Sequence, residues 1–224
     1  MTVPVPLATA EEIRTHLVDQ LNQALRRAGM FGGEVALRLL IDHLLFVERR
    51  PEAFARQQQE WEERGLWSCI GVRGAFRDAM LGHSDEYGMA SVYGEFAQRC
   101  GWLSPDRVLA PRAYEDLVGR VRRWAGKDRT WADVTTEFGE PSVLFGGTNP
   151  RYGKTLGYLS EDPEQPMVFF HLWNDFEREA EQPLLLAVRF SGQPLPHALT
   201  FTPQGELRRS ATGEPCSSAP PSRP

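Results

Sequence analysis

The spacing of the apolar residues changes along the chain, and this change constrains the fold more than any other feature. Up to about Ala125 the apolar residues recur every three to four positions, as they do on one side of an α-helix. From about Val143 to Leu207 they alternate with other residues, as they do in a β-strand. We therefore expect an α+β fold, in which an N-terminal helical bundle is followed by a helix and an antiparallel sheet of three to five strands.

The helical half begins with a recognisable start. Thr9 and Glu12 have the spacing of a capping box, in which each side chain bonds the other residue's free backbone N–H. An apolar stripe with a four-residue period follows at Ile13, Leu17, Leu21 and Leu25. The segment 34–49 is apolar on more than one side, which predicts a helix in the middle of the bundle.

A second capping box marks the division between the two halves. Thr130 and Asp133 have the required spacing, and Gly139 supplies the stop for the short helix that they begin. We therefore assign residues 1–129 to a helical bundle and residues 130–207 to a helix plus antiparallel sheet. Whether the two parts share one core is left open by the sequence.

The strands of the second part differ in their patterns. The run 167–173 is apolar on both faces, as expected of a central strand that is covered on both sides. Residues 203–205 combine proline and glycine and predict a turn. The tail 208–224 has too little apolar surface to offset the entropy lost on ordering, so we expect it to be disordered.

Charge and composition limit the functional class. The net charge of -5 argues against nucleic-acid binding as the main activity. No segment approaches the roughly 18 uncharged apolar residues of a membrane helix, and residues 1–10 lack the features of a secretory signal. Cys69, Cys100 and Cys216 are widely spaced, which disfavours a zinc site and a disulfide framework. We expect a cytoplasmic protein with no metal, cofactor or membrane partner.

Residues 130–207 resemble a known type of fold. The residues that carry the resemblance are Val134-x-x-x-Phe138-Gly139-x-Pro141, followed by the predicted strands. This order resembles the helix, G-x-P turn and antiparallel strands of the SmpA/OmlA and β-lactamase-inhibitor-protein group, and of small immunity-type proteins that neutralise bacterial toxins. These families have no catalytic residues to transfer. The resemblance implies a bacterial interaction module of immunity or inhibitor type that binds a partner protein, such as a toxin, through its sheet half.

His171 is the main candidate for chemistry. The two-residue period places it on the same strand face as Phe169 and Trp173, with Asp175 just beyond. One interpretation makes His171 and Asp175 the catalytic or ligand-binding groups of an enzyme or small-ligand-binding protein, in a pocket between bundle and sheet. The other is a core histidine satisfied by hydrogen bonds. We favour the second, because no other histidine lies at metal-ligand spacing.

The glycine-rich segment 146–150 is the second candidate. Its backbone N–H groups, with Arg151 and Lys154, have the chemistry to cradle an anion. The alternative is a plain connecting loop, since Lys154 leads into a strand and a phosphate-binding loop leads into a helix. Acidic residues after the central strand would complement a basic partner. The expected partner- or ligand-binding residues are Arg151, Tyr152, Lys154, Trp173, Asp175 and Glu177.

Overall fold

A computed structural model describes residues 7–80, 85–174 and 180–211 of the chain. The helices of the first half are α1 (Ala10–Arg26), the 3-10 turn η1 (Ala28–Met30), α2 (Gly33–Val47), α3 (Ala53–Glu63), α4 (Val72–Met80), α5 (Asp85–Arg99) and α6 (Pro111–Trp124). After α7 (Trp131–Phe138) come β1 (Val143–Phe145), β2 (Lys154–Tyr158), β3 (Val168–Trp173), β4 (Leu184–Phe190), α8 (Leu195–Ala198), β5 (Leu199–Phe201) and α9 (Pro203–Ala211). The predicted α+β fold is confirmed.

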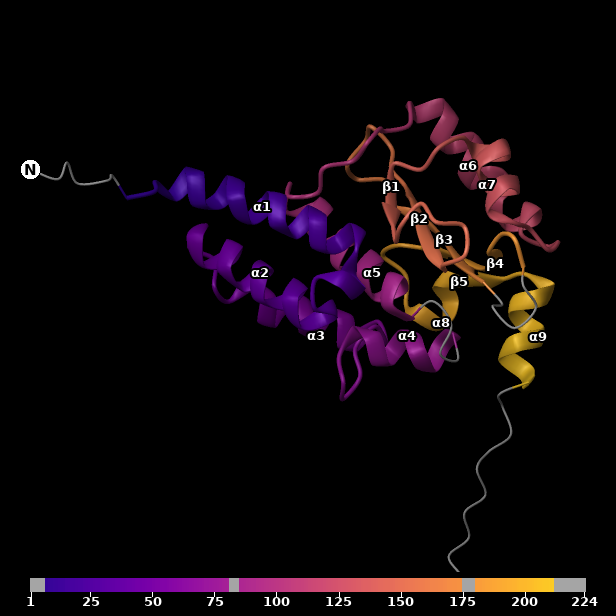
Figure 1. Cartoon of the computed structure of the whole chain (residues 1–224), viewed down its shortest axis with the longest axis horizontal. Coiled ribbons are helices and arrows are strands. Elements are labelled where there is room, and N and C mark those ends of the chain that lie inside the picture. The colour runs from indigo at the N-terminus through magenta and orange to yellow at the C-terminus, as the bar shows by residue number, and fades with distance from the viewer. Residues whose placement is uncertain (1–6, 81–84, 175–179, 212–224) are drawn as a thin grey trace, which may run out of the picture.

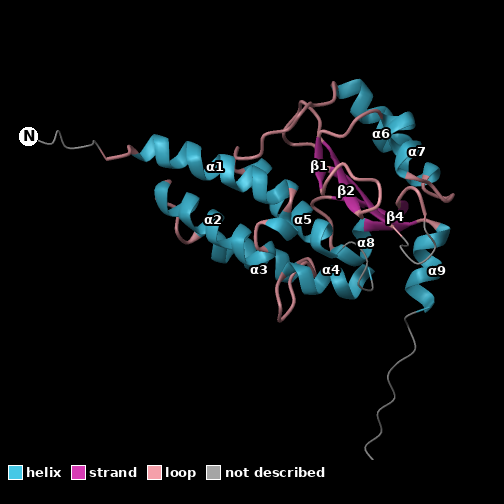
Figure 2. Cartoon of the chain, in the orientation of Figure 1, coloured by secondary structure: helices cyan, strands magenta, loops and turns pink. Residues whose placement is uncertain are grey.

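The five strands form one antiparallel sheet in the order in which they occur along the chain, β1-β2-β3-β4-β5 (Figure 1), and Figure 2 draws these strands in magenta. The central strand β3 is paired on both sides, with Thr155 opposite His171 on β2 and Ala187 opposite His171 on β4. It is buried along nearly its whole length, as its two-sided apolar pattern predicts. Both edge strands are only three residues long, which limits pairing with other chains.

The sheet is the middle layer of the molecule. One face packs against the bundle, where Phe145 and Phe169 join the core of α1 to α5. The other face is covered by α6 and α7, which lie together on that side of the sheet in Figure 1. There Val121 and Phe138 pack with Phe170 in a separate core. The bundle and the sheet therefore share a core, and α6, which precedes the expected division at residue 129, packs with the sheet.

The capping boxes form as the sequence predicts. Thr9 and Glu12 exchange both bonds at the start of α1, and Thr130 and Asp133 do the same at the start of α7. Gly139 ends α7 with a φ of 75°, a conformation that strongly favours glycine. These contacts span three residues or one turn, so the local sequence specifies them.

The end of the chain differs from the prediction. Residues 203–205 begin α9, and residues 208–211 belong to that helix, so the predicted turn and the predicted disorder are wrong there. Thr202 starts the helix locally, because its hydroxyl accepts the N–H of Gly205. A distant residue, Asp128, adds a second cap through the N–H of Gln204, and the helix packs on β4. Residues 212–224 lie outside the described residues.

Helix α2 is not covered on all sides, contrary to the prediction. Its inner side is buried against α1, α3 and α5 at Leu37, Ile41, Leu44 and Leu45. On the opposite side, Val35, Leu39 and Phe46 keep 75%, 55% and 74% of their surface exposed. The helix is apolar on two sides, but the described residues supply neighbours for only one of them.

Candidate functional site

His171, the main candidate for chemistry, lies on the face of β3 that meets the bundle. It is fully buried, and its Nδ1 lies 3.0 Å from the hydroxyl of Thr155. Its ring packs between Phe76 of α4 and Phe169. Burial, and then the nearby guanidinium of Arg189, hold the pKa of His171 well below its ordinary value of 6.5. His171 is therefore a neutral core residue at neutral pH, and its Nε2 has no hydrogen-bond partner among the described residues.

A buried ionic cluster joins the sheet to the bundle beside His171. Arg189 of β4 donates to the carboxylate of Glu95 at 3.0 Å and to the hydroxyl of Ser91 at 3.0 Å. The second oxygen of Glu95 pairs with Arg64 at 2.9 Å. Burial raises the pKa of Glu95, but pairing with Arg189 and Arg64 outweighs burial, so the pKa is lowered and the cluster is ionised. Sequence analysis missed this cluster, although a charged residue within the apolar strand LLLAVRF is a recognisable feature.

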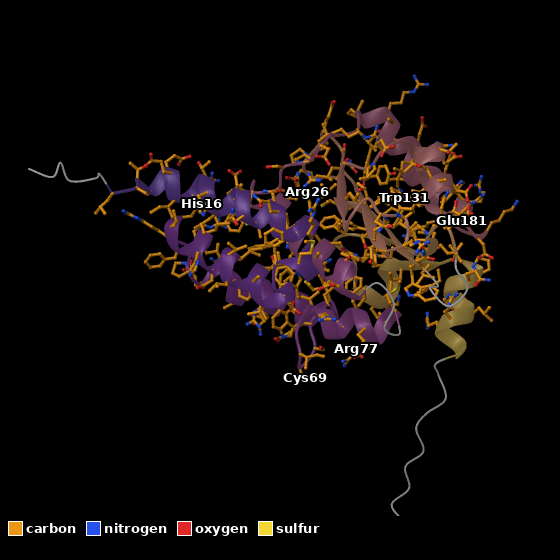
Figure 3. All side chains as sticks on the ribbon, viewed as in Figure 1. His16, Arg26, Cys69, Arg77, Trp131 and Glu181 are labelled. Atoms are coloured by element: carbon orange, nitrogen blue, oxygen red, sulfur yellow. The ribbon has the colours of Figure 1, made fainter. Side chains whose placement is uncertain are left out.

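Lys154 is buried on the other face of the sheet. Its Nζ donates to the backbone oxygens of Gly147 and Asn149, both at 2.9 Å. It also lies 3.8 Å from the ring centroid of Trp131, at the start of α7 (Figure 3). No carboxylate of the described part of the chain pairs with it, and burial lowers its pKa from 10.5 to about 8. Lys154 thus holds the 146–153 loop in place by hydrogen bonds from its buried side, and its charge is not exposed at the surface.

The remaining predicted binding residues lie in different environments. Arg151 and Tyr152 are exposed on the 146–153 loop. Trp173 is half-buried, with the guanidinium of Arg208 3.9 Å from its ring centroid. Asp175 and Glu177 lie outside the described residues. The structure therefore places Arg151 and Tyr152 on the 146–153 loop, Lys154 at the start of β2 beneath that loop, and Trp173 on β3.

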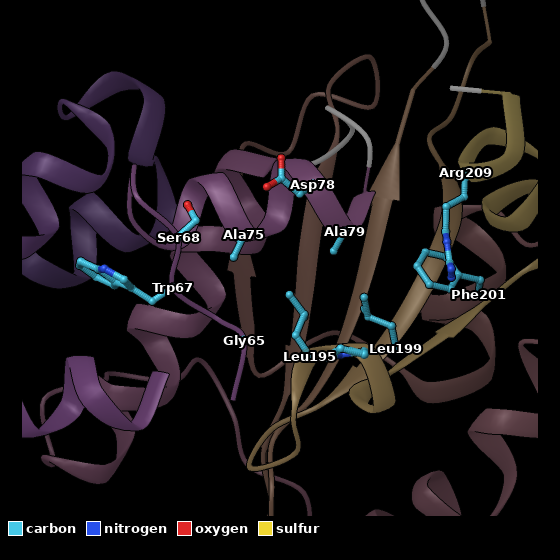
Figure 4. A pocket seen from close by; sticks show the side chains of 11 residues that line it. Gly65, Trp67, Ser68, Ala75, Asp78, Ala79, Leu195, Leu199, Phe201 and Arg209 are labelled. Carbon is cyan, nitrogen blue, oxygen red and sulfur yellow. The ribbon is translucent and has the colours of Figure 1, made fainter. Parts of the chain in front are cut away.

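One hollow of about 420 Å³ opens between α4 and the β5 end of the sheet (Figure 4). Ala75 and Ala79 of α4 face Leu195 and Leu199 across it, and the space remains because the alanines are small. Its full lining is Gly65, Trp67, Ser68, Ala75, Asp78, Ala79, Leu195, Pro196, Leu199, Phe201 and Arg209. The walls are mainly apolar, and its charged groups are exposed.

A second hollow, of about 380 Å³, lies where the bundle meets the 146–153 loop. Its lining comes from the α1–α2 turn, from α5 and from the loop: Arg27, Gly29, Met30, Tyr87, Gly147, Asn149 and Tyr152. The loop is held against α1 by a 2.8 Å bond from the N–H of Gly146 to the oxygen of Arg26, a residue marked in Figure 3. His171 lines neither hollow.

The outer side of α2 carries a third, shallower hollow of about 330 Å³. It is lined by Val35, Arg38, Leu39, Asp42 and Phe54. The guanidinium of Arg38 lies 5.8 Å and 5.2 Å from the ring centroids of Phe54 and Trp67. This surface therefore combines apolar side chains with one carboxylate, Asp42, for which the described residues supply no ion-pair partner.

The described residues contain neither a metal-binding cluster nor a membrane-spanning helix. They contain no group of three or more histidine, cysteine, aspartate or glutamate residues able to hold a metal ion. They also contain no helix with the length and apolar character needed to cross a membrane.

A comparison of the chain with protein-family models, with curated proteins and with solved structures finds no match. The resemblance of residues 130–207 to immunity-type folds therefore stays a prediction, and the case for function rests on the molecule's own surfaces.

Proposed function

We propose that this protein is an interaction module that binds a partner protein through the outer side of α2. The contact surface, here called the apolar strip, comprises Met30, Phe31, Val35, Leu39 and Phe46. These residues follow one another from the α1–α2 turn to the end of α2. The observation that carries the proposal is that α2 exposes large apolar side chains directly opposite its buried side.

The exposure is unusual for a helix on the surface of a bundle. Such a helix normally turns one apolar stripe inward and covers the opposite side with charged and polar residues. Exposed apolar side chains that stand singly need no explanation, but a contiguous row rimmed by polar groups marks a contact surface. Val35, Leu39 and Phe46 form a row along one side of the helix, spaced by four and seven residues, with the polar Asp42 between the last two.

The spacing and charge of the strip indicate the kind of partner. A second helix laid along α2 would meet Val35, Leu39 and Phe46 with its own residues at helical spacing. Asp42 lies within this row and finds no cation to pair with among the described residues, since Arg38 is stacked over aromatic rings of the bundle. We infer an amphipathic helix that carries a lysine or arginine among its apolar anchors. A symmetric antiparallel pairing with a second copy would bring two Asp42 carboxylates together, which disfavours self-association.

The proposed function belongs to the class that the sequence favours, but its main contact surface lies on α2 and not on the sheet half. Binding of a basic partner is what the predicted immunity or inhibitor role requires, and the net charge of -5 would speed encounter with such a partner. The sheet itself offers no open face, because helices cover both sides. From the sheet half, Tyr152 reaches the neighbourhood of the strip, since it shares a hollow with Met30.

Site-specific photo-crosslinking tests the proposal. A photoreactive phenylalanine analogue replaces Leu39 in the full-length chain, expressed in its native cells, and the matched control carries the analogue at the exposed Arg123 of α6. We expect position 39 to cross-link to one protein, at a basic amphipathic helix, and position 123 not to do so. Phe46→Glu should reduce the cross-link by about tenfold or more, as expected when a charge enters an apolar contact.

A second exposed apolar residue controls for non-specific adhesion. Leu207→Glu also places a charge on an exposed apolar residue, but on α9, away from α2, and it should leave the cross-link unchanged. Equal cross-linking by wild type and Phe46→Glu would contradict the proposal. So would a cross-link only to a second copy of this chain, or no cross-link at position 39.

A further inference from the structure

The hollow between the α1–α2 turn and the 146–153 loop has the chemistry of an anion site. Arg27 supplies a guanidinium for which the described part of the chain supplies no carboxylate or other hydrogen-bond partner. Tyr87 and Tyr152 contribute hydroxyl groups and aromatic rings from α5 and the loop, and Asn149 adds an amide. These groups come from three separate segments, so only the folded chain assembles them.

Both tyrosines line the hollow, Tyr87 from α5 and Tyr152 from the 146–153 loop. Burial, followed by the nearby charge of Glu86, raises the pKa of Tyr87 above its ordinary value of 10. Tyr87 therefore keeps its proton at neutral pH and acts as a hydrogen-bond donor. Met30 adds a flexible apolar side chain to the lining.

The loop wall of the hollow is held in place before any ligand binds. Lys154 bonds the oxygens of Gly147 and Asn149 from behind, and the side-chain amide of Asn174 bonds those of Pro150 and Arg151. The side-chain oxygen of Asn149 accepts the N–H of Arg151 within the loop. A wall that is already ordered loses little entropy on binding, which favours affinity for a small ligand.

A neighbouring carboxylate restricts the charge of the ligand. A Cβ atom placed on Gly29, in the lining, would lie 2.7 Å from a carboxylate oxygen of Glu86. Glu86 is thus close behind this wall and would repel a second negative charge. A singly charged carboxylate suits the site better than a phosphate dianion.

We propose that this hollow binds a small aromatic carboxylate, with the carboxylate on Arg27 and the planar body between Tyr87, Tyr152 and Met30. The volume of about 380 Å³ lies within the usual range for small-ligand sites. Guanidinium groups pair with carboxylates through two parallel hydrogen bonds, and the rings offer stacking surfaces for a planar molecule. The proposal does not rest on the partner-binding role of α2.

Titration of the full-length chain with 2-naphthoate, followed by calorimetry and ligand-detected NMR, tests the site. The matched ligand is 2-naphthamide, which has the same shape and no charge. We expect 2-naphthoate to bind about tenfold or more tightly than 2-naphthamide, because the charge-assisted pairing with Arg27 is lost in the amide. Arg27→Gln should remove that difference and leave 2-naphthamide binding unchanged.

The controls separate this site from general attraction of anions. Arg123→Gln removes an exposed cation from α6 and should bind 2-naphthoate as the wild type does. Phe46→Glu, which disables the apolar strip, should also leave 2-naphthoate binding intact, so the two proposals can fail independently. The inference is overturned if 2-naphthoate does not bind at millimolar concentration, if both ligands bind equally, if Arg27→Gln has no effect, or if inorganic phosphate competes as strongly as 2-naphthoate.

Discussion

Two cations are buried on opposite faces of the same sheet, and the chain stabilises their charges in different ways. Arg189 of β4 points into the bundle, where it meets the carboxylate of Glu95. Lys154 of β2 points toward α7, where it meets two backbone oxygens and the face of Trp131. Both side chains are fully buried, but only Arg189 has a counter-charge among the described residues.

The difference shows what each cation does for the structure. Arg189 and Glu95 join β4 to α5, segments about ninety residues apart, so their pair fixes how the bundle sits on the sheet. Lys154 acts over a short distance, because its acceptors lie five and seven residues away in the 146–153 loop. The first pair orders two halves of the molecule, and the second orders one loop that forms the wall of a hollow.

The largest expected effect comes from removing the counter-charge of Arg189. Glu95→Gln leaves the guanidinium buried without its carboxylate, which should lower the free energy of unfolding by about 3–5 kcal/mol. Urea denaturation monitored by circular dichroism measures the loss. The matched control is Glu137→Gln, which breaks the surface pair with Arg120 and should cost less than about 1 kcal/mol. Equal losses of unfolding free energy in the two variants would show that the buried pair contributes no more to stability than the surface pair.

Replacing Lys154, the cation without a counter-charge, should lower the free energy of unfolding less than Glu95→Gln does. Lys154→Met keeps an apolar side chain but leaves two carbonyl oxygens without a donor, so we expect a loss of about 2 kcal/mol at pH 7. The pKa of Lys154 is about 8 in the folded chain, below the 10.5 of the unfolded chain. The stability that Lys154 contributes is therefore full above pH 10.5 and is lost as the pH falls from 10.5 through 8. The cost of the substitution should therefore be greater at pH 10 than at pH 7. A cost independent of pH would place a counter-charge beside Lys154.

The smallest effect concerns His171, which shares the bundle side of the sheet with Arg189. Its folded pKa lies well below 6.5, so the wild type should lose stability as the pH falls below 6.5, because the unfolded chain takes up a proton that the folded chain does not. His171→Asn cannot take up that proton. The stability gap between the two proteins should therefore narrow by about 1 kcal/mol between pH 7.5 and pH 5.5, measured by urea denaturation. A constant gap would show that His171 takes up a proton in the folded chain as readily as in the unfolded chain.

The sequence predicted the candidate site only in part. It identified the 146–153 loop with Arg151 and Tyr152, and the adjoining Lys154, because glycine-rich composition and charge are visible locally. It did not identify Arg27, which enters the same hollow from more than one hundred residues away along the chain. Nor did it indicate that Lys154 turns inward, since the pattern of a strand does not tell which face a neighbouring helix will cover.

The sequence alone determined the kind of each main element. Capping boxes at Thr9 and Thr130, the stop at Gly139 and the two-residue period of the strands depend on contacts within a few residues. Only the tertiary structure decided which sides are covered: that the sheet lies between the bundle and α6 with α7, that Asp128 caps α9, and that the outer side of α2 stays open. The physical reason is that burial depends on which distant segment packs against a surface, and residue spacing along the chain carries no record of that neighbour.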